Sequence, residues 1–296
     1  MEGKHVPIPV NIDTVNALFD LSIKDSTQMD EWLKKEQVHY DHEPKNSEEM
    51  ALSRVGPRLY NWIFKPYTFK QWARYPAELG PEVTARIPVR NNHDNRYFSD
   101  PYQALPTKGY TAIFERLLDS RHITVRTNTD YFQVKDSLKC GRLYYTGPID
   151  TYFAHLGWPK LEYRSLDFER VVKRDTDHFQ TASVVNHPQD KDDFTRIVEY
   201  KHLLNQSSPH TIYFVERSKD GGEPYYPVPN EKNQALYRRY QEMASKEKNV
   251  TFVGRLANYK YFNMDQAILN ALELFDTDTG IPETEQWTDL LEKEMS

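Results

Sequence analysis

The 296-residue sequence contains a single cysteine, Cys140, so it can form neither an intrachain disulfide nor a cysteine-rich zinc site. No basic segment followed by an apolar one opens the chain, and no apolar run reaches the roughly 18 residues that cross a membrane. We therefore expect a protein without a membrane span, in the reducing setting of the cytoplasm.

The sequence is not basic either. Lys and Arg number 38 against 44 Asp and Glu, which gives a net charge of -6. The chain as a whole is therefore not built to bind nucleic acid or an anionic membrane, and any anionic ligand must be held by local Arg and Lys. Hydrophobic residues make up 38%, enough for the core of one large domain or of two to three interleaved ones.

The common catalytic and nucleotide-binding motifs are absent as well. The sequence has no G-x-G-x-x-G, G-x-x-x-x-G-K-[ST], G-x-S-x-G or H-E-x-x-H. His39 and His42 lie beside Asp41 and Glu43, but a metal site needs a further converging ligand, so a solvated connection is the favoured interpretation and no metal is expected. No pair of carboxylates stands out as a glycosidase pair.

Apolar spacing and capping residues predict that the first part of the chain is helical. Asn11 or Asp13 would cap the first helix, Asn46 or Ser47 the third, and Gly56 with Pro57 would interrupt the third. The expected helices cover residues 11–19, 26–37, 47–64 and 109–118, with long loops over 73–108.

Alternating apolar and polar residues predict strands after His122. The expected strands cover 123–126, 143–146, 161–168, 182–186, 195–200, 211–216 and 250–256, with helices over 230–245 and 264–274. This order predicts an α+β protein in which a helical domain precedes a mostly antiparallel, twisted sheet.

Arginines and aromatic residues are the most informative side chains. Arg is costly to bury in an apolar strand unless an anion pairs with it, and that anion is either an Asp or Glu, such as Glu199 or Asp193 for Arg196, or a ligand. Most of the 20 Tyr, 14 Phe and 5 Trp are explained by the core. Together the two sets indicate a bound diphosphate and a stacked base. The arginines concerned are Arg86, Arg90 and Arg96, near Trp72 and Tyr97, and the strand arginines Arg164, Arg196 and Arg255.

Eight segments follow one another in an order and spacing that match one family. They are 65–72 (KPYTFKQW), 86–90 (RIPVR), 95–98 (NRYF), 145–150 (YTGPID), 161–165 (LEYRS), 195–199 (TRIVE), 223–228 (EPYYPV) and 254–264 (GRLANYKYFNM). Through them the chain resembles UDP-galactopyranose mutase from about His5 to Leu274.

The resemblance implies an isomerase that interconverts UDP-galactopyranose and UDP-galactofuranose for cell-wall or surface polysaccharide. In that family reduced FAD carries the chemistry through an adduct between the flavin N5 and the sugar while UDP departs and returns. The resemblance also implies a helical domain over 11–118 with a mobile substrate loop at about 73–90. It implies a sheet substrate domain over 119–229 and the C-terminal part of a flavin-binding α/β domain over 230–275. Beyond the resemblance, acidic residues predict a tail over 276–296.

Site residues follow from the same resemblance, position by position. Arg86 and Arg196 would clamp the diphosphate as the catalytic pair, with hydroxyl donors from Tyr226 and Tyr261. The uridine would be held by Tyr67, Thr68, Trp72 and Tyr97, with Tyr97 stacked on the uracil, and Asn186 would meet the sugar. Near the flavin would lie Arg164, Glu216, Arg255, Asn263 and Met264.

The sequence also departs from the family. The family opens with a strand, a Gly-rich turn and a helix that hold the FAD pyrophosphate, whereas this sequence begins after them, so we expect this chain alone to lack the main phosphate cradle. Asn263 stands where the family has Asp, and Pro66 and Ala73 stand where it has Gly. Three interpretations follow: a piece of a full enzyme, one half of a split enzyme with a separate flavin-binding polypeptide, or a flavin-free UDP-sugar binder. A homodimer is a further expected assembly.

Overall fold

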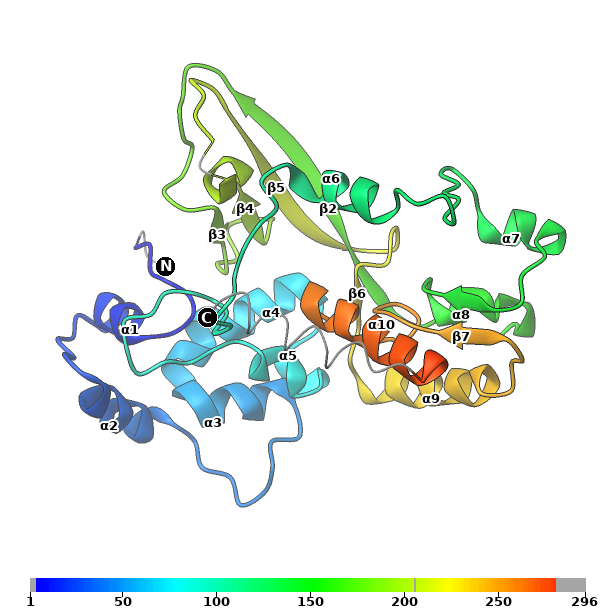
Figure 1. The fold of residues 1–296 in the computed structure, drawn as a ribbon. Coiled ribbons are helices and arrows are strands. Elements are labelled where there is room, and N and C mark those ends of the chain that lie inside the picture. Colours follow the sequence, from blue (N-terminus) through cyan, green and yellow to red (C-terminus); the bar gives the residue numbers. More distant parts are fainter. Residues whose placement is uncertain (1–3, 205, 281–296) are drawn as a thin grey trace. The chain divides into compact units, whose positions relative to one another are not determined.

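The structure is a computed structural model that describes residues 4–204 and 206–280 (Figure 1). Contacts divide the chain into two compact units. The first unit comprises Met1–Asp136 and Leu166–Lys219, and the second Ser137–Ser165 and Asp220–Ser296. Helices combine with an antiparallel sheet, which confirms the predicted α+β class.

Three capped helices open the first unit, as the sequence predicts. They are α1 (Ile12–Phe19), α2 (Ser26–Glu36) and α3 (Ser47–Leu59). The side chains of Asn11, Asp25 and Asn46 each accept a hydrogen bond from the backbone N–H three residues on, which satisfies a donor that the first helical turn leaves open. Their apolar faces build a core in which Val10, Val15, Met29, Val55 and Leu59 are fully buried.

The helical path kinks where the sequence places Gly56 and Pro57. Gly56 has φ +73°, and a Cβ there would lie 2.1 Å from the carbonyl oxygen of Glu36, so only glycine fits. Beyond the kink the chain stays helical for longer than predicted, first as a π-helix, η1 (Tyr60–Phe64), and then as α4 (Lys65–Trp72). Pro66 is the second residue of α4, which follows the π-helix directly.

The predicted loop region after α4 holds two short helical turns, η2 (Pro76–Glu78) and α5 (Glu82–Ala85). Three hydrogen bonds fasten it to the start of α3. Ser47 N donates to Leu79 O at 3.0 Å, Ser47 Oγ to Gly80 O at 2.5 Å, and Thr84 Oγ1 to Ser47 O at 2.8 Å. Arg54 Nη1 adds a bond to Thr84 O at 3.0 Å. The segment thus follows α3 closely although it lacks a long regular element.

The predicted helix near residue 110 is confirmed as α6 (Gly109–Leu117), but the strand expected at 123–126 is wrong. Ile123 and Val125 are 44% and 54% exposed, and the segment is irregular. Its β-branched residues favour an extended chain, but no neighbouring strand pairs with it, and pairing is what stabilises a strand. Short helical turns follow at α7 (Tyr131–Val134), η3 (Lys135–Ser137), η4 (Ala154–Leu156) and η5 (Tyr200–Leu204).

Five strands form the main sheet, in the order β3-β4-β5-β2-β6. The pairs β3–β4, β4–β5 and β2–β6 are antiparallel. β2 and β5 run further than predicted. No strand was expected at β6, which is two residues long and ends in a proline. The strands are β2 (Tyr163–Lys173), β3 (Val184–Asn186), β4 (Arg196–Val198), β5 (Thr211–Asp220) and β6 (Tyr226–Pro227).

A parallel strand pair and three helices lie in the second unit. β1 (Leu143–Tyr145) pairs with β7 (Val250–Phe252), and the helices are α8 (Ile149–Tyr152), α9 (Glu231–Ala244) and α10 (Met264–Thr279). Ile149, Phe153 and Tyr240 are each 1% exposed at the centre of its core. α10 takes in residues 276–279 of the predicted acidic tail and Gly280 caps it, while residues 281–296 lie outside the described residues.

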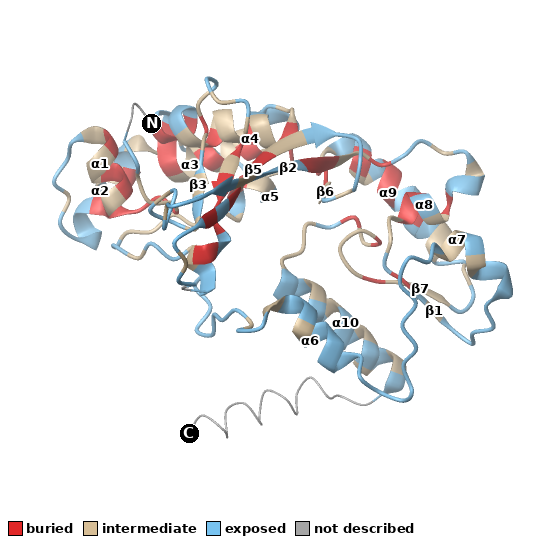
Figure 2. Cartoon of the chain, turned by 90° about the horizontal axis from the view of Figure 1, so that it is seen from above, coloured by how far each residue is buried: buried red, intermediate tan, exposed pale blue. Residues whose placement is uncertain are grey.

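Burial is uneven between the helices. Figure 2 shows buried residues gathered on α1, α3 and the middle of the sheet, whereas α6 and α10 are pale blue and tan along their lengths and bury no residue. On α10, Met264, Ile268, Leu272 and Phe275 are all more than 40% exposed and follow helical spacing. Among residues 4–204 and 206–280, no helix combines the length and the apolar character that crossing a bilayer requires.

Candidate functional site

Three of the predicted site residues form one row across the sheet. Asn186 on β3 is paired with Arg196 on β4, and Arg196 is paired with Glu216 on β5. Directly opposed residues of antiparallel strands project from the same face, so the register brings the three side chains together. Arg196 Nε donates to a carboxylate oxygen of Glu216 at 2.6 Å, with the Glu216 side chain 3% exposed and that of Arg196 33% exposed.

The partner of Arg196 is therefore not one of the two carboxylates close to it in sequence. Glu199 accepts instead from the backbone N–H groups of Phe179 and Gln180, at 2.9 and 3.0 Å, and Asp193 binds Arg217. Glu216 comes from the neighbouring strand, 20 residues further along the chain. A buried carboxylate thus holds a partly exposed guanidinium at the sheet surface, as an anion-binding arginine requires.

Tyr200, at the start of η5, belongs beside this row, and the sequence did not single it out. Burial raises the pKa of Tyr200, the charge of Glu216 raises it further, and that of Arg196 acts in the opposite direction. The phenol therefore stays protonated and can donate a hydrogen bond. The sequence feature that could have pointed to Tyr200 is its position four residues after Arg196.

The predicted uridine residues on α4 are partly core residues. Thr68 and Trp72, four positions apart on one helical face, are 4% and 6% exposed, while Tyr67 is half-buried. Tyr97 is half-buried as well, and its ring meets that of Phe98 edge-to-face with centroids 5.1 Å apart. Of this aromatic set, Tyr67 and Tyr97 are therefore the more accessible members.

Two of the loop arginines bind a carboxylate in the first unit. Arg90 and Arg96 both pair with Asp94, at 3.2 and 2.9 Å, and Arg90 also donates to the carbonyl of Arg96 at 2.9 Å. Hydrogen bonds from Arg96 hold the pKa of the Asp94 carboxyl far below its usual range. For Arg90 and Arg96 the paired anion is therefore a carboxylate of this chain. Arg86, which the sequence assigns to the diphosphate, is a half-buried residue at the end of α5.

A second cluster lies in the second unit and joins Tyr226, Tyr261 and Arg255. The two phenol rings are stacked, with centroids 5.4 Å apart and 13° between the planes. The guanidinium carbon of Arg255 lies 4.3 Å from the centroid of the Tyr261 ring, and Arg255 also donates to the carbonyls of Tyr225 and Phe262, at 3.1 and 2.7 Å. Arg255 thereby fixes the segments that carry both tyrosines.

Arg164 and Asn263 complete the predicted residues of this unit, together with Met264. Arg164 is 4% exposed, pairs with Asp220, and lies opposite Tyr226 in the β2–β6 register. Asn263 caps α10 in a capping box with Gln266, whose side chain accepts from Asn263 N at 2.9 Å. Met264, which follows, is 58% exposed. The start of α10 therefore combines the positive end of a helix with an exposed apolar side chain.

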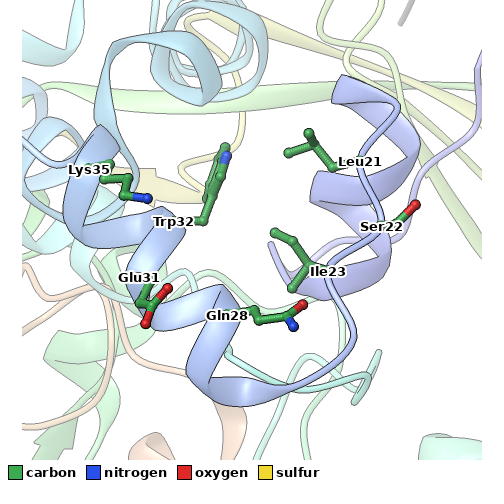
Figure 3. Close-up of a pocket in the computed structure, with 7 residues that line it drawn as sticks. All are labelled: Leu21, Ser22, Ile23, Gln28, Glu31, Trp32 and Lys35. Carbon is green, nitrogen blue, oxygen red and sulfur yellow. The ribbon is translucent and has the colours of Figure 1, made fainter.

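A shallow pocket of about 300 Å³ lies elsewhere in the first unit, beside α2. Figure 3 shows Leu21 and Ile23 facing Trp32 across it. None of the predicted site residues lines it, and the sequence did not indicate it. Its lining is Leu21, Ser22, Ile23, Gln28, Glu31, Trp32 and Lys35. Across residues 4–204 and 206–280 no cluster of His, Cys, Asp and Glu is suited to a metal ion.

Comparison with known proteins decides the family. A family model for UDP-galactopyranose mutase matches residues 62–261, and the chain is 32% identical over 280 residues to a probable UDP-galactopyranose mutase of Klebsiella pneumoniae. The chain belongs to the UDP-galactopyranose mutase family. This confirms the resemblance inferred from the eight segments, and the matched range holds every predicted site residue except Asn263 and Met264.

The alignment with the Klebsiella mutase covers 93% of this chain and 72% of that protein. A second member of the comparison, the dTDP-fucopyranose mutase of Escherichia coli, is 30% identical over 281 residues, which cover 92% of this chain and 74% of the relative. A crystal structure of reduced UDP-galactopyranose mutase superposes with a TM-score of 0.68 at 19% identity, over 93% of this chain and 76% of that one. The fold of this mutase-family chain is therefore shared with the solved enzyme.

Proposed function

We propose that this isomerase interconverts UDP-galactopyranose and UDP-galactofuranose. The observation that carries the proposal is Arg196, a partly exposed guanidinium held by the buried Glu216 within the range that matches the mutase family. A diphosphate leaving group must be stabilised and yet remain able to attack again. A guanidinium binds it through two parallel hydrogen bonds and needs no proton transfer.

In this proposal Arg196 and Arg86 bind the diphosphate. Asn186, which shares the row with Arg196, binds the sugar. Tyr226 and Tyr261 donate their hydroxyls to the diphosphate, and the contacts of Arg255 support both rings. The uridine is bound by α4 and the turn near residue 97, through Tyr67, Thr68, Trp72 and Tyr97.

Reduced FAD is the proposed cofactor, and when bound it supplies the nucleophile that displaces UDP. The chain's own groups fit the ring end of this cofactor. Arg164 and Arg255 are cationic, and Asn263 and the exposed Met264 stand at the positive start of α10. Glu216, also assigned to the flavin, has the further role of orienting Arg196. The 296 residues contain no G-x-G-x-x-G turn, so in this proposal the FAD phosphates are held by a segment outside these residues, on the same or on a separate polypeptide.

A dTDP-sugar is the second candidate substrate. The relative from Escherichia coli is a dTDP-fucopyranose mutase, and its identity to this chain is within two percentage points of that of the Klebsiella mutase. The two nucleotides differ at the 2′-hydroxyl and the 5-methyl group. The residues that meet uracil and ribose, and not the diphosphate clamp, therefore decide between them.

Titration of the purified protein with UDP and with dTDP in a calorimeter tests binding. We expect UDP to bind in the range of about 1 μM to 1 mM that is usual for such sites, and more tightly than dTDP. No heat and no change in Trp72 fluorescence at millimolar UDP would refute the proposal, and tighter binding of dTDP would transfer it to the second candidate. Turnover is then measured by chromatography of UDP-galactofuranose incubated with the protein and reduced FAD.

If the protein binds UDP but shows no turnover with reduced FAD, the third interpretation, a flavin-free UDP-sugar binder, is favoured. If turnover begins only after a flavin-binding polypeptide is added, the chain is a piece of a full enzyme or one half of a split enzyme. In both outcomes the chain still binds the nucleotide, and the outcomes differ in whether FAD can be bound and used.

A further inference from the structure

Lys70, in the last turn of α4, directs its ammonium group at the connection between β3 and β4. Its Nζ donates to the carbonyls of His187 at 2.8 Å and Phe194 at 3.3 Å, and also to the carbonyl of Gln189. An ammonium has three donors, and these three carbonyls accept from all of them. The contacts join residues more than 110 positions apart in the sequence.

The β3–β4 connection, residues 187–195, is held together by contacts of its own. His187 N donates to Thr195 O at 2.8 Å, which closes the connection at its base. The His187 ring bonds to Asp192 at 3.0 Å and lies 4.6 Å from the ring of Phe194. Asn186 directly precedes this connection, and Arg196 follows its last residue. A group that holds the connection therefore holds both of these residues.

A second tie joins the same end of α4 to β5. Ser218 Oγ donates to the carbonyl of Gln71 at 2.5 Å, and Ser218 lies two residues after Glu216. Lys70 and Gln71 are neighbours, so one end of α4 is fastened both to the β3–β4 connection and to β5. Thr68 and Trp72 flank them on the same helix.

We propose that Lys70 is a positioning residue that sets the spacing between the uridine-binding helix α4 and the row formed by Asn186, Arg196 and Glu216. This rests on the proposed function, because it takes α4 as the uridine side and Arg196 as the diphosphate side. Lys70 does not touch the nucleotide, since its three donors are used on carbonyls. It acts by keeping two subsites at the separation that a nucleoside diphosphate spans, which removes an ordering cost from binding.

A ligand that bridges both subsites depends on their separation, whereas a ligand that fills only one does not. Affinities of Lys70→Met for UDP, uridine and pyrophosphate therefore test the role. We expect UDP affinity to fall about tenfold, the size of one lost charge-assisted contact, and the affinities for uridine and pyrophosphate to stay within about twofold. Lys70→Arg keeps a charged donor and should recover part of the loss.

The matched control is Lys65→Met, at the start of the same helix. Lys65 Nζ lies 5.9 Å from the centroid of the Tyr75 ring, so this variant removes a like charge from α4 without touching the β3–β4 connection. Its UDP affinity should equal that of the unchanged protein. Ser218→Ala, which cuts only the second tie, should show a smaller loss that is again specific to UDP.

Equal losses for UDP and for one fragment would show that Lys70 supports a single subsite and would overturn the proposal, as would unchanged UDP affinity. If Lys70→Met does not fold, the affinities of Lys70→Arg and Ser218→Ala for UDP, uridine and pyrophosphate are compared instead. An unchanged protein that binds none of the ligands would instead refute the proposed function itself.

Discussion

The Nε of Arg196 donates to a carboxylate oxygen of Glu216 at 2.6 Å, and the two residues are directly opposed on β4 and β5. The carboxylate is 3% exposed and the arginine side chain 33%, so the buried member fixes the accessible one. The Arg196 guanidinium therefore stays partly accessible, which our proposal that it binds the diphosphate requires.

Arg196→Ala should weaken UDP binding by one to two decades, since a charge-assisted contact contributes roughly 1.5 to 3 kcal/mol. The variant should also melt earlier, because it leaves Glu216 buried without this partner. Arg86→Ala should cost less affinity, on the prediction from the sequence that the loop at about 73–90 moves, although Leu79, Gly80 and Thr84 are bonded to α3 in the structure. Melting temperature and UDP affinity are measured on the same preparations.

Arg90→Ala is the control for these variants. Arg90 bonds to Asp94 and to the carbonyl of Arg96, so its loss should lower stability and leave the UDP affinity of the folded protein unchanged. The clamp assignment fails if folded Arg196→Ala binds UDP normally and has lost only stability.

Ala73→Gly should stabilise the protein. Ala73 ends α4 with φ +49° and ψ +33°, the left-handed region, which costs a residue with a Cβ roughly 1 to 2 kcal/mol. Glycine removes that strain but adds about 0.4 to 1 kcal/mol of unfolded-state entropy, so we expect a net gain of roughly 0 to 1.6 kcal/mol.

Chemical denaturation measures that gain. The matched control is Ala17→Gly inside α1, where the same exchange should cost about 1 kcal/mol because the helix interior has no strain to relieve. A stability loss at both positions would mean that the backbone at residue 73 is not strained.

Glu199 should make stability depend on acid pH. Burial raises the pKa of its carboxyl, but hydrogen bonds from Thr211, Phe179 and Gln180 outweigh burial and lower the pKa below the ordinary 4.5. A lowered folded-state pKa contributes stability above pH 4.5, and this contribution is lost as pH falls through the folded value. Glu199→Gln should therefore destabilise most at neutral pH, with the difference shrinking below pH 4.5.

Asp150 provides the opposite case. Burial raises the pKa of its carboxyl above the ordinary 3.8, so its charged form costs stability as pH rises above that value. The stability of Asp150→Asn relative to the unchanged protein should thus be highest at neutral pH. Denaturant unfolding of both variants between pH 3 and 7 measures how their stability relative to the unchanged protein changes with pH. If this difference changes in the same direction for Glu199→Gln and Asp150→Asn, the opposite pKa shifts are contradicted.

The features that the sequence predicted well are those with local causes. Asn11 and Asn46 cap helices through a backbone N–H three residues away, and Gly56 marks its kink by its own conformation. The strand expected at 123–126 failed for a different reason. Its residues have the right propensity, but a strand needs a neighbour, and the choice of neighbour depends on the rest of the chain.

The same limit applies to the site. Arg196 could be selected as a costly residue within an apolar strand, but its carboxylate could not, because strand register and not sequence distance brings Glu216 to it. Lys70 lies in the first of the eight segments but was assigned no role, since a lysine at the end of a helix resembles a solvated one until its carbonyl partners are known. The family resemblance implied roles for these residues, whereas the contacts between them depend on the fold.

Because the 296 residues contain no Gly-rich phosphate-binding turn, the purified chain should not retain stoichiometric FAD. If only the ring end is recognised, through groups such as Arg255 and the start of α10, then FAD and riboflavin should bind equally within about threefold, because the phosphates add no specific contact. Absorbance of the purified protein measures retention, and fluorescence titration of both flavins measures recognition. Flavin that copurifies at one equivalent, or FAD that binds more than tenfold tighter than riboflavin, would show that this chain holds a phosphate site of its own. Adding a flavin-binding polypeptide from a relative should then leave FAD affinity unchanged, whereas on our proposal it should raise it.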